Sequence, residues 1–314
     1  MSPVAARMRA IAYTTYGGPD VLELTDLPTP KVGPDSVLVR VRATSVNPVD
    51  WKVREGYLDG LMDTVFPVVP GWDVAGVVEQ VGLDVHELEV GDEVFGYVRK
   101  DVVGGGTTAE LVAAPVRTLA HKPQTASFEE AAAIPLAGLT AYQALHRLGV
   151  TEGDTVLIHA AAGGVGGFAV QIARALGARV IGTAGERNHD HLRALGAEPV
   201  AYGDGLVERV RALAPDGVDV VLDLVGDGAV ATTPEVGTAD VRVGSVADAE
   251  VTAVGGTYMW VRPSSTDLAA LAALVDQGKV RTDVAQVFPL EETAAAHELS
   301  ASGHVRGKVV VRVA

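Results

Sequence analysis

The feature that most constrains the fold of this chain is an apolar strand that runs directly into a cluster of glycines. The pattern is strand, turn, helix and strand, over residues 155–160, 160–167, 167–176 and 179–183. In such a unit, Gly163 lets the backbone approach a phosphate and Gly166 lets helix and strand pack closely, while the helix N-terminus attracts an anion. Ala161 occupies the first glycine position of the G-x-G-x-x-G pattern. The unit predicts a dinucleotide-binding site, and a glycine-rich turn without a ligand is the alternative.

Length and composition narrow the classes of protein further. A chain of 314 residues exceeds the size at which one core usually keeps growing, so we expect two domains. The 25 Lys and Arg against 40 Asp and Glu give a net charge of −15, which argues against nucleic acid as a partner. The absence of cysteine excludes disulfides, thiolate metal ligands and a cysteine nucleophile. We see neither a signal peptide nor an apolar run that could span a bilayer, so we expect a cytoplasmic protein without a membrane partner.

The texture of the sequence changes along the chain. From Met8 to about Leu119, short β-rich runs alternate with Gly and Pro turns, which predicts a barrel-like β domain. Strands and helices then alternate in the way typical of a doubly wound sheet: helices at 128–133 and 139–148, then elements at 155–160, 167–176, 179–183, 189–195, 199–202, 206–213 and 218–225. β texture returns at 284–288 and 308–313. We therefore expect an α/β fold with a β-rich domain at 1–125 and 272–314, and a parallel-sheet domain at 126–271.

Six ordered segments together resemble the zinc-independent quinone oxidoreductase branch of the medium-chain dehydrogenase/reductase superfamily. They are SVNPVDWKVREG, FPVVPGWDVAGVVEQVG, VGDEVFGY, AAAIPLAGLTAYQAL, HAAAGGVGGFAVQIARALGARVIGT and GHVRGKVVV, at 45–56, 66–82, 90–97, 131–145, 159–183 and 303–311. The resemblance covers nearly the whole chain. It implies a GroES-like catalytic domain completed by the end of the chain, an inserted Rossmann domain, a cofactor in the cleft between them, and a homodimer formed through the edge of the Rossmann sheet.

The resemblance also bears on metal chemistry. Zinc-dependent relatives carry Gly-His-Glu where this chain has Gly71-Trp72-Asp73, and a catalytic cysteine where it has Asn47. Without cysteine or histidine at these positions, and without the four-cysteine lobe, we expect neither zinc site and no Lewis acid. Hydride transfer from a reduced nicotinamide to the β-carbon of an α,β-unsaturated carbonyl or a quinone fits instead, with hydrogen-bond donors stabilising the enolate.

The residues beyond the glycine turn indicate which dinucleotide binds. NAD sites place an acid about 20 residues after the glycines, whereas this strand ends at the uncharged Thr183. Arg187 follows in the next loop, and Tyr202 matches a tyrosine that contacts the 2′-phosphate in similar enzymes. We interpret these features as an NADPH site. Glu186 could instead hold a ribose, and Arg187 could be a solvated loop charge.

The resemblance implies further cofactor contacts. Asn47 would contact the nicotinamide ribose, Thr140 the nicotinamide end, and Lys308 would lie where the tail closes the cleft. The alternatives are a turn-forming Asn before Pro48, a helix-capping hydroxyl, and an exposed strand charge. The predicted cofactor-binding set is completed by residues of the turn and of the strand at 218–225, namely Ala162, Gly163, Gly164, Val165 and Val225.

The proton donor is harder to assign. Bacterial quinone reductases of this branch carry a tyrosine where this chain has Lys52, so Lys52, Tyr57 or a water could protonate the enolate. The alternatives are a surface lysine and a pocket wall. We expect Asp50 and Arg54 to pair with each other as scaffold. His159, beside the phosphate turn, is interpreted as a structural histidine.

The region from Gly226 to Gly256 departs furthest from the family pattern. It is too polar and too broken for a long helix, so we expect the Rossmann half to be trimmed there. Tyr258 and Trp260 are candidate walls of the substrate pocket, with core or dimer packing as the alternative. Taken together, the sequence predicts an NADPH-dependent reductase of a small electrophilic enone, enal or quinone. A tailoring enoyl reductase with a bulky substrate and a non-catalytic NADP(H)-binding regulatory or structural protein are the alternatives.

Overall fold

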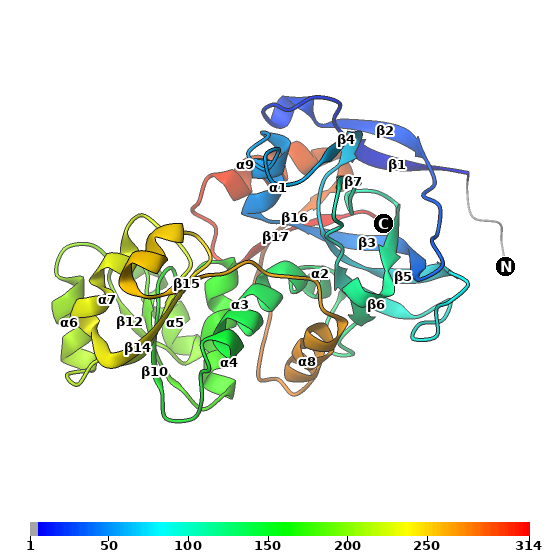
Figure 1. The fold of residues 1–314 in the computed structure, drawn as a ribbon. Helices are drawn as coiled ribbons and strands as arrows, with labels where there is room; N and C mark the ends of the chain where they lie inside the picture. Colours follow the sequence, from blue (N-terminus) through cyan, green and yellow to red (C-terminus); the bar gives the residue numbers. More distant parts are fainter. Residues whose placement is uncertain (1–5) are drawn as a thin grey trace. The chain divides into compact units, whose positions relative to one another are not determined.

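The computed structural model describes residues 6–314, and they form two compact units (Figure 1). The β-rich unit comprises the residues up to Leu136 together with 262–276 and 282–314. The parallel-sheet unit comprises 137–261 and 277–281. The topology of their sheets confirms the expected α/β fold, with a β-rich part and a doubly wound parallel sheet. The domain boundaries expected at 125/126 and 271/272 stay a prediction.

The β-rich unit is built around a seven-stranded sheet. β17 pairs parallel with β16 and antiparallel with β3, so the end of the chain joins strands from its first half. The sheet order is β16 (Val284–Pro289), β17 (Lys308–Arg312), β3 (Ser36–Val46), β5 (Asp73–Val81), β6 (Glu93–Tyr97) and β9 (Leu119–His121), with β8 (Leu111–Pro115) on β3. Smaller elements are the pairs β1 (Arg7–Ala12) with β2 (Glu23–Pro28) and β4 (Thr64–Val69) with β7 (Val103–Gly105), and the helices α1 (Pro48–Arg54), α2 (Phe128–Ala132), α8 (Ser265–Asp276) and α9 (Thr293–Ala301).

Strand β3 shows why this half of the sequence forms a sheet. Val37, Val39 and Val41 lie in one apolar cluster, whereas Leu38 lies in another. Successive side chains of a strand point to opposite faces, so a strand covered on both faces is apolar at successive positions. β-branched side chains suit such a strand because they pack well on the pleated surface.

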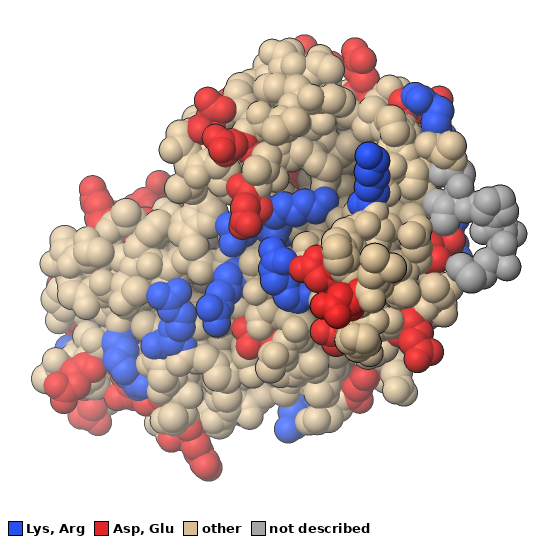
Figure 2. All heavy atoms as spheres, turned by 45° about the vertical axis from the view of Figure 1, so that its right-hand side comes forward, with Lys and Arg blue, Asp and Glu red and all other residues tan. Residues whose placement is uncertain are grey.

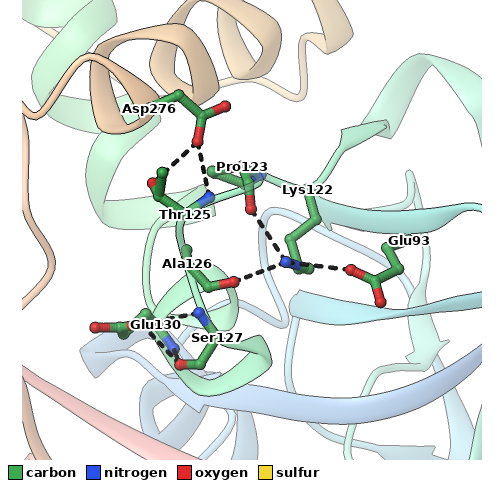
Figure 3. A network of polar contacts seen from close by, with 8 residues as sticks. All are labelled: Glu93, Lys122, Pro123, Thr125, Ala126, Ser127, Glu130 and Asp276. Atoms are coloured by element: carbon green, nitrogen blue, oxygen red, sulfur yellow. Dashed lines mark hydrogen bonds and ion pairs between the residues drawn. The ribbon is translucent and has the colours of Figure 1, made fainter.

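The segment after β9 is held by the ammonium of Lys122, as Figure 3 shows. Its Nζ donates to the carbonyl oxygens of Pro123 (3.0 Å) and Ala126 (2.7 Å) and forms an ion pair with Glu93 (3.2 Å). The Lys122 side chain is almost completely buried. A buried charge needs such partners, so the path of this segment is closely specified.

Helix α2 begins directly after this segment with a capping box. The Ser127 hydroxyl accepts from the backbone N–H of Glu130 at 3.2 Å, and the Glu130 carboxylate accepts from the Ser127 N–H at 2.8 Å (Figure 3). Asp276 accepts from both the N–H and the hydroxyl of Thr125 at 3.0 Å. α2 packs on β3 and β5. These contacts therefore hold the start of α2 in place against the sheet.

The parallel-sheet unit contains a six-stranded sheet in which every pairing is parallel. The order is β12 (Glu198–Val200), β11 (Arg179–Thr183), β10 (Thr155–Ile158), β13 (Val218–Asp223), β14 (Gly237–Ser245) and β15 (Thr257–Tyr258). The helices are α3 (Pro135–Arg147), α4 (Gly164–Ala175), α5 (His189–Leu195), α6 (Leu206–Leu213) and α7 (Thr233–Val236). The order reverses between β10 and β13, and ligands of such sheets bind at the carboxyl ends of the strands at this point.

The region between β13 and β15 contains no long helix, as expected from its sequence. Its α-helix, α7, spans four residues, and 3-10 turns occur at 229–232 and 249–254. Pro234 lies in the first turn of α7, and Gly237 leaves the helix in an extended conformation. The Rossmann half is therefore trimmed at this point.

The surface carries both signs of charge. Figure 2 shows Asp and Glu side chains at many points of one face, with Lys and Arg side chains among them, so this face is not uniformly basic. No helix within residues 6–314 combines the length and the apolar character needed to cross a membrane.

Candidate functional site

The glycine turn of the parallel-sheet unit joins the end of β10 to the start of α4. Gly163 is the N-cap residue of α4, and no side chain caps the helix there. A Cβ added to Gly166 would lie 2.4 Å from the carbonyl oxygen of Ala160, so only glycine fits between helix and turn. A Cβ on Gly163 would meet one atom, the same oxygen at 3.3 Å, and otherwise open space. The helix N-terminus therefore presents its backbone to an open side, as an anion site requires.

The turn is fastened to the neighbouring strand by Thr183. The buried Thr183 hydroxyl accepts from the N–H of Ala160 at 3.0 Å, and the Thr183 carbonyl accepts from Ala161 at 3.0 Å. Ala160 has a φ of 55°, which is uncommon for a residue with a Cβ, and these bonds hold it there. The predicted cofactor residue Thr183 thus shapes the backbone of the turn.

A second anchor lies at the ends of β13 and β14, and sequence reasoning missed it. Asp223 is completely buried, and its carboxylate accepts from the N–H groups of Val225 and Gly226 at 3.0 Å each. The Ser245 hydroxyl donates to the same carboxylate at 2.6 Å. These bonds fix the loop that exposes Val225, a predicted cofactor residue. An acid closing the apolar run Val-Asp-Val-Val-Leu-Asp was the signal that could have revealed this anchor.

His159 directly follows β10, the strand that lies between β11 and β13 in the sheet, and is buried. Burial lowers the pKa of its ring, and the nearby Asp223 opposes this only in part, so the ring is neutral at physiological pH. Its Nε2 has no hydrogen-bond partner among the described residues. This environment agrees with the interpretation of His159 as a structural residue.

The loops after β11 and β12 lie side by side. Arg187 and Glu186 are both exposed in the 3-10 turn that follows β11. Tyr202, which is 68% exposed, follows β12. A Cβ added to Gly185 would lie 3.9 Å from the Tyr202 ring and hydroxyl. The structure thus brings the segment carrying Arg187 next to Tyr202.

The β-rich unit contains a buried polar network centred on Asn47, Asp73 and Lys308. The amide nitrogen of Asn47 donates to Asp73 Oδ2 at 2.8 Å, and the Lys308 ammonium donates to the amide oxygen of Asn47. Asp73 also accepts from the Ser45 hydroxyl (2.7 Å) and from the backbone N–H of Leu136 (2.8 Å). Because both ends of the Asn47 amide are bonded, its orientation is fixed.

Burial shifts the pKa values of the charged groups in this network. Burial raises the pKa of Asp73, and the nearby Lys308 ammonium opposes that rise; burial lowers the pKa of Lys308, which Asp73 and Asp50 oppose. Asp50 accepts from the backbone N–H of Asn47 at 2.7 Å. Burial, with a further contribution from the charge of Asp73, raises the pKa of Asp50 to about 7. Asp50 is therefore a buried acid of this network whose pKa lies near neutral pH.

Two expectations for this region are corrected by the structure. Lys308 is only 5% exposed, so the alternative of an exposed strand charge is wrong. The expected pair between Asp50 and Arg54 is also wrong, because Asp50 bonds to the Asn47 backbone. The buried Arg54 instead donates to Nδ1 of His297 at 3.1 Å and to the Gly17 carbonyl at 3.0 Å. A helical spacing of four residues does not reveal that one partner points into the network and the other toward α9.

The remaining predicted residues lie in different environments. Lys52 is exposed, with its Nζ 5.5 Å from the centroid of the Trp51 ring, and Tyr57 is 72% exposed. Thr140 is buried within α3 of the parallel-sheet unit. Neither Lys52 nor Tyr57 has a hydrogen bond to Asn47, Asp73 or Lys308 in the described part of the chain.

The aromatic side chains Trp72, Tyr258 and Trp260 differ in their exposure. Trp72 is buried and packs edge-on against Tyr97, with centroids 6.1 Å apart. Tyr258 ends the edge strand β15 and Trp260 follows it; both are partly exposed, and the Trp260 indole donates to the Tyr258 hydroxyl at 3.2 Å. Within residues 6–314, no group of three or more His, Asp and Glu is placed to hold a metal ion.

Comparison with known proteins adds family matches over both parts of the chain. Residues 33–124 match the family described as alcohol dehydrogenase GroES-like domain, and residues 195–311 match the family described as zinc-binding dehydrogenase. A 2-methylene-furan-3-one reductase of Solanum lycopersicum is 36% identical over 98% of this chain and 80% of its own length. An NADPH-dependent alkenal/one oxidoreductase of Arabidopsis thaliana, chloroplastic, has the same identity and the same coverage.

Solved structures extend the comparison to the fold. The quinone oxidoreductase from Coxiella burnetii aligns with a TM-score of 0.86 at 36% identity, over 98% of this chain and all of that chain. A structure described as an NAD-dependent alcohol dehydrogenase aligns with a TM-score of 0.87 at the same identity and coverage. Two of these names record a dinucleotide, NADPH for the Arabidopsis thaliana oxidoreductase and NAD for the alcohol dehydrogenase.

Proposed function

The chain belongs to the quinone oxidoreductases of the medium-chain dehydrogenase/reductase superfamily, and we propose that it is a zinc-independent, NADPH-dependent reductase of an α,β-unsaturated carbonyl or a quinone. When bound, the reduced nicotinamide supplies a hydride for the β-carbon of the acceptor. The chain supplies binding, orientation and hydrogen-bond donors.

One observation carries the dinucleotide part of this proposal. The first turn of α4 lacks a side-chain cap, and Gly163 leaves open space on the side from which a phosphate would approach. Gly166 allows the helix to pack against Ala160, so that the first turn of α4 starts close to the end of β10. These residues fit a pyrophosphate, whose charge the helix N-terminus favours by roughly 0.3–1 kcal/mol or more.

The choice of NADPH rests on the residues beyond β11. Thr183 ends the strand without the carboxylate that binds the ribose 2′-hydroxyl in NAD sites. Arg187 and Tyr202 are both exposed, and their loops lie side by side. A guanidinium and a phenol are suitable donors for a 2′-phosphate. We therefore propose that these two side chains bind that phosphate.

The network in the β-rich unit supports the assignment of donors. The fixed Asn47 amide uses one of its two N–H bonds on Asp73, which leaves a second for a ligand. Lys308 adds a buried ammonium that holds the amide oxygen. We propose that Asn47, with Lys308 behind it, binds the nicotinamide ribose, and that Thr140 contacts the nicotinamide end.

Protonation of the enolate needs a donor from solvent or from a side chain. Lys52 and Tyr57 are exposed and can exchange protons with water, so both are proposed as donors. In kinetics with Lys52→Met and Tyr57→Phe, loss of the true donor lowers kcat by roughly 10²–10⁴-fold. Wild-type kcat in both variants would assign the proton to water.

The decisive experiment for the function is spectrophotometric. The purified protein is mixed with NADPH, and separately with NADH, across a panel of small enones, enals and quinones. We expect absorbance at 340 nm to fall with NADPH. NADPH binding without turnover of small acceptors favours the bulky-substrate enoyl reductase. Quenching of tryptophan fluorescence by the cofactor, with no turnover even in a metabolite extract, favours a non-catalytic role.

A further inference from the structure

Arg209, a residue outside the predicted site, organises the loop that carries Tyr202. We propose that Arg209 is a positioning residue for the 2′-phosphate of NADPH, acting through this loop rather than by contact with the phosphate. The inference rests on the proposed use of NADPH. It adds a determinant of the preference for NADPH over NADH that lies in helix α6.

The geometry of Arg209 is that of a clamp on consecutive carbonyl groups. Its Nε donates to Ala201 at 3.0 Å, and Nη1 donates to Asp204 at 2.9 Å. Nη2 lies 3.4 Å from the carbonyl oxygen of Tyr202 and 3.3 Å from that of Gly203. One planar guanidinium therefore binds four successive carbonyl oxygens, which a single ammonium could not do.

Arg209 supplies most of the hydrogen bonds to the carbonyls of this exposed loop. β12 ends at Val200, so the following carbonyls have no strand partner, and the Leu206 N–H adds one bond to the Gly203 carbonyl at 3.1 Å. Gly203 and Gly205 have φ values of 83° and 76°, so the backbone turns sharply on either side of Asp204. Tyr202 itself is largely exposed, so the backbone of this loop sets the point from which its side chain can reach a ligand.

The clamp also leaves a positive charge beside the proposed phosphate site. Arg209 bonds to carbonyl oxygens and belongs to none of the ion pairs found within residues 6–314. Its charge is therefore not cancelled by a paired carboxylate, although Glu186, Asp204 and Glu208 lie in the neighbouring sequence. A 2′-phosphate benefits from such a charge, whereas a ribose hydroxyl does not.

Helix α6 offers a matched control. Arg211 lies on the same helix and also binds backbone carbonyls, those of Glu235 at 2.8 Å and Pro215 at 3.0 Å. Arg209→Met and Arg211→Met make the same change of charge and of side chain. They differ in which segment of backbone loses its clamp.

The test measures binding by calorimetry with two probes, adenosine 2′,5′-bisphosphate and 5′-AMP, so that turnover is not needed. We expect Arg209→Met to weaken binding of the bisphosphate about tenfold, which corresponds to about 1.4 kcal/mol. We expect its affinity for 5′-AMP to stay within about twofold of wild type, because 5′-AMP has no 2′-phosphate. Arg209→Lys keeps the charge but not the fork, and we expect it to lose at least threefold. Retained 5′-AMP affinity shows that each variant is folded.

Several outcomes would overturn this role. An unchanged bisphosphate preference in Arg209→Met does so, as does an equal loss in Arg211→Met, which would indicate a general effect of charge. Wild-type affinity in Arg209→Lys would show that charge alone acts. If the wild-type protein itself does not prefer the bisphosphate, the NADPH assignment fails first. Amide hydrogen exchange of residues 202–205 gives a separate readout, and we expect it to be faster in Arg209→Met only.

Discussion

At the scale of single residues, Asp73 and Lys308 form a buried ion pair, with 3.9 Å between Lys308 Nζ and Asp73 Oδ2. Both side chains are buried, and the charge of each opposes the pKa shift that burial causes in the other. Removing one partner leaves an uncompensated buried charge. The pair is thus a condition for folding as well as for the orientation of Asn47.

This argument predicts a specific double-mutant cycle. Lys308→Met is expected to lower the free energy of unfolding by about 3–5 kcal/mol, because the Asp73 carboxylate is left unpaired. Asp73→Asn/Lys308→Met is expected to recover much of that loss. Urea unfolding of the variants measures this, and additive losses in the double variant would contradict a coupled pair.

Asp50 predicts a dependence of stability on pH. Its pKa is about 7 in the folded protein against 3.8 ordinarily, so the folded state holds this proton more tightly than the unfolded chain. The resulting stabilisation is fully present below about pH 4 and is lost as pH rises through 7. Asp50→Asn stays neutral, so we expect its stability relative to wild type to rise between pH 4 and pH 8. A constant difference across that range in thermal unfolding would refute the raised pKa.

Residue-level prediction from sequence worked where partners are close along the chain and failed where they are not. The glycine turn and the uncharged Thr183 could be recognised from local pattern. The network could not, because Asn47, Asp73, Leu136 and Lys308 are joined only by the fold. The error over Asp50 and Arg54 has the same cause, since spacing on a helix does not determine which buried partners are available.

At the scale of elements, the strand-turn-helix unit separates binding from folding. Gly163→Ala places a methyl group 3.3 Å from the Ala160 carbonyl oxygen and otherwise in open space, at an ordinary φ of −76°, whereas Gly166→Ala forces it against three backbone atoms of Ala160 and Ala161 at 2.4–2.6 Å. Substitution of the two glycines by alanine is therefore expected to lower the free energy of unfolding by different amounts.

We expect Gly163→Ala to keep its stability within about 1 kcal/mol and Gly166→Ala to lose about 1–3 kcal/mol through overpacking. Both variants should bind dinucleotide more weakly, the first because the methyl group lies where the phosphates approach. Thermal unfolding and cofactor titration separate the effects. Equal stability losses would contradict the different roles of the two glycines.

Element boundaries were predicted best where a cap or stop lies in the sequence. The expected ranges 179–183, 189–195 and 206–213 coincide with β11, α5 and α6. β12 ends two residues earlier than expected, because the carbonyls of 201–204 bond to Arg209 instead of to a neighbouring strand. Arg209 lies close along the chain, but a side chain that binds backbone carbonyls produces no sequence pattern from which the end of a strand can be predicted.

At the scale of the whole molecule, the family resemblance predicted the fold because its six segments span both units. The trimmed region between β13 and β15 was also visible in the sequence, since its polar and broken pattern cannot support a long helix. The identity of the acceptor was not predictable from sequence. It depends on the shape of the substrate pocket, which is set by contacts between side chains from distant parts of the chain.

The assembly is a further prediction at this scale. β15 is the edge strand of the parallel sheet, and an edge strand presents unpaired backbone groups to a partner. Tyr258 and Trp260 are partly exposed beside it. We expect light scattering to give twice the chain mass of 32.4 kDa. A mass near that of one chain would contradict a homodimer.

The central claim is direct hydride transfer to the β-carbon of an enone, and isotope transfer tests it most directly. The protein is incubated with an enone accepted in the spectrophotometric panel and with NADPH deuterated at C4, prepared in both stereochemical forms, and the product is analysed by NMR. We predict that one form delivers deuterium to the β-carbon while the α-carbon takes its hydrogen from water. Deuterium at the carbonyl carbon, or none in the product, would contradict the proposed reaction.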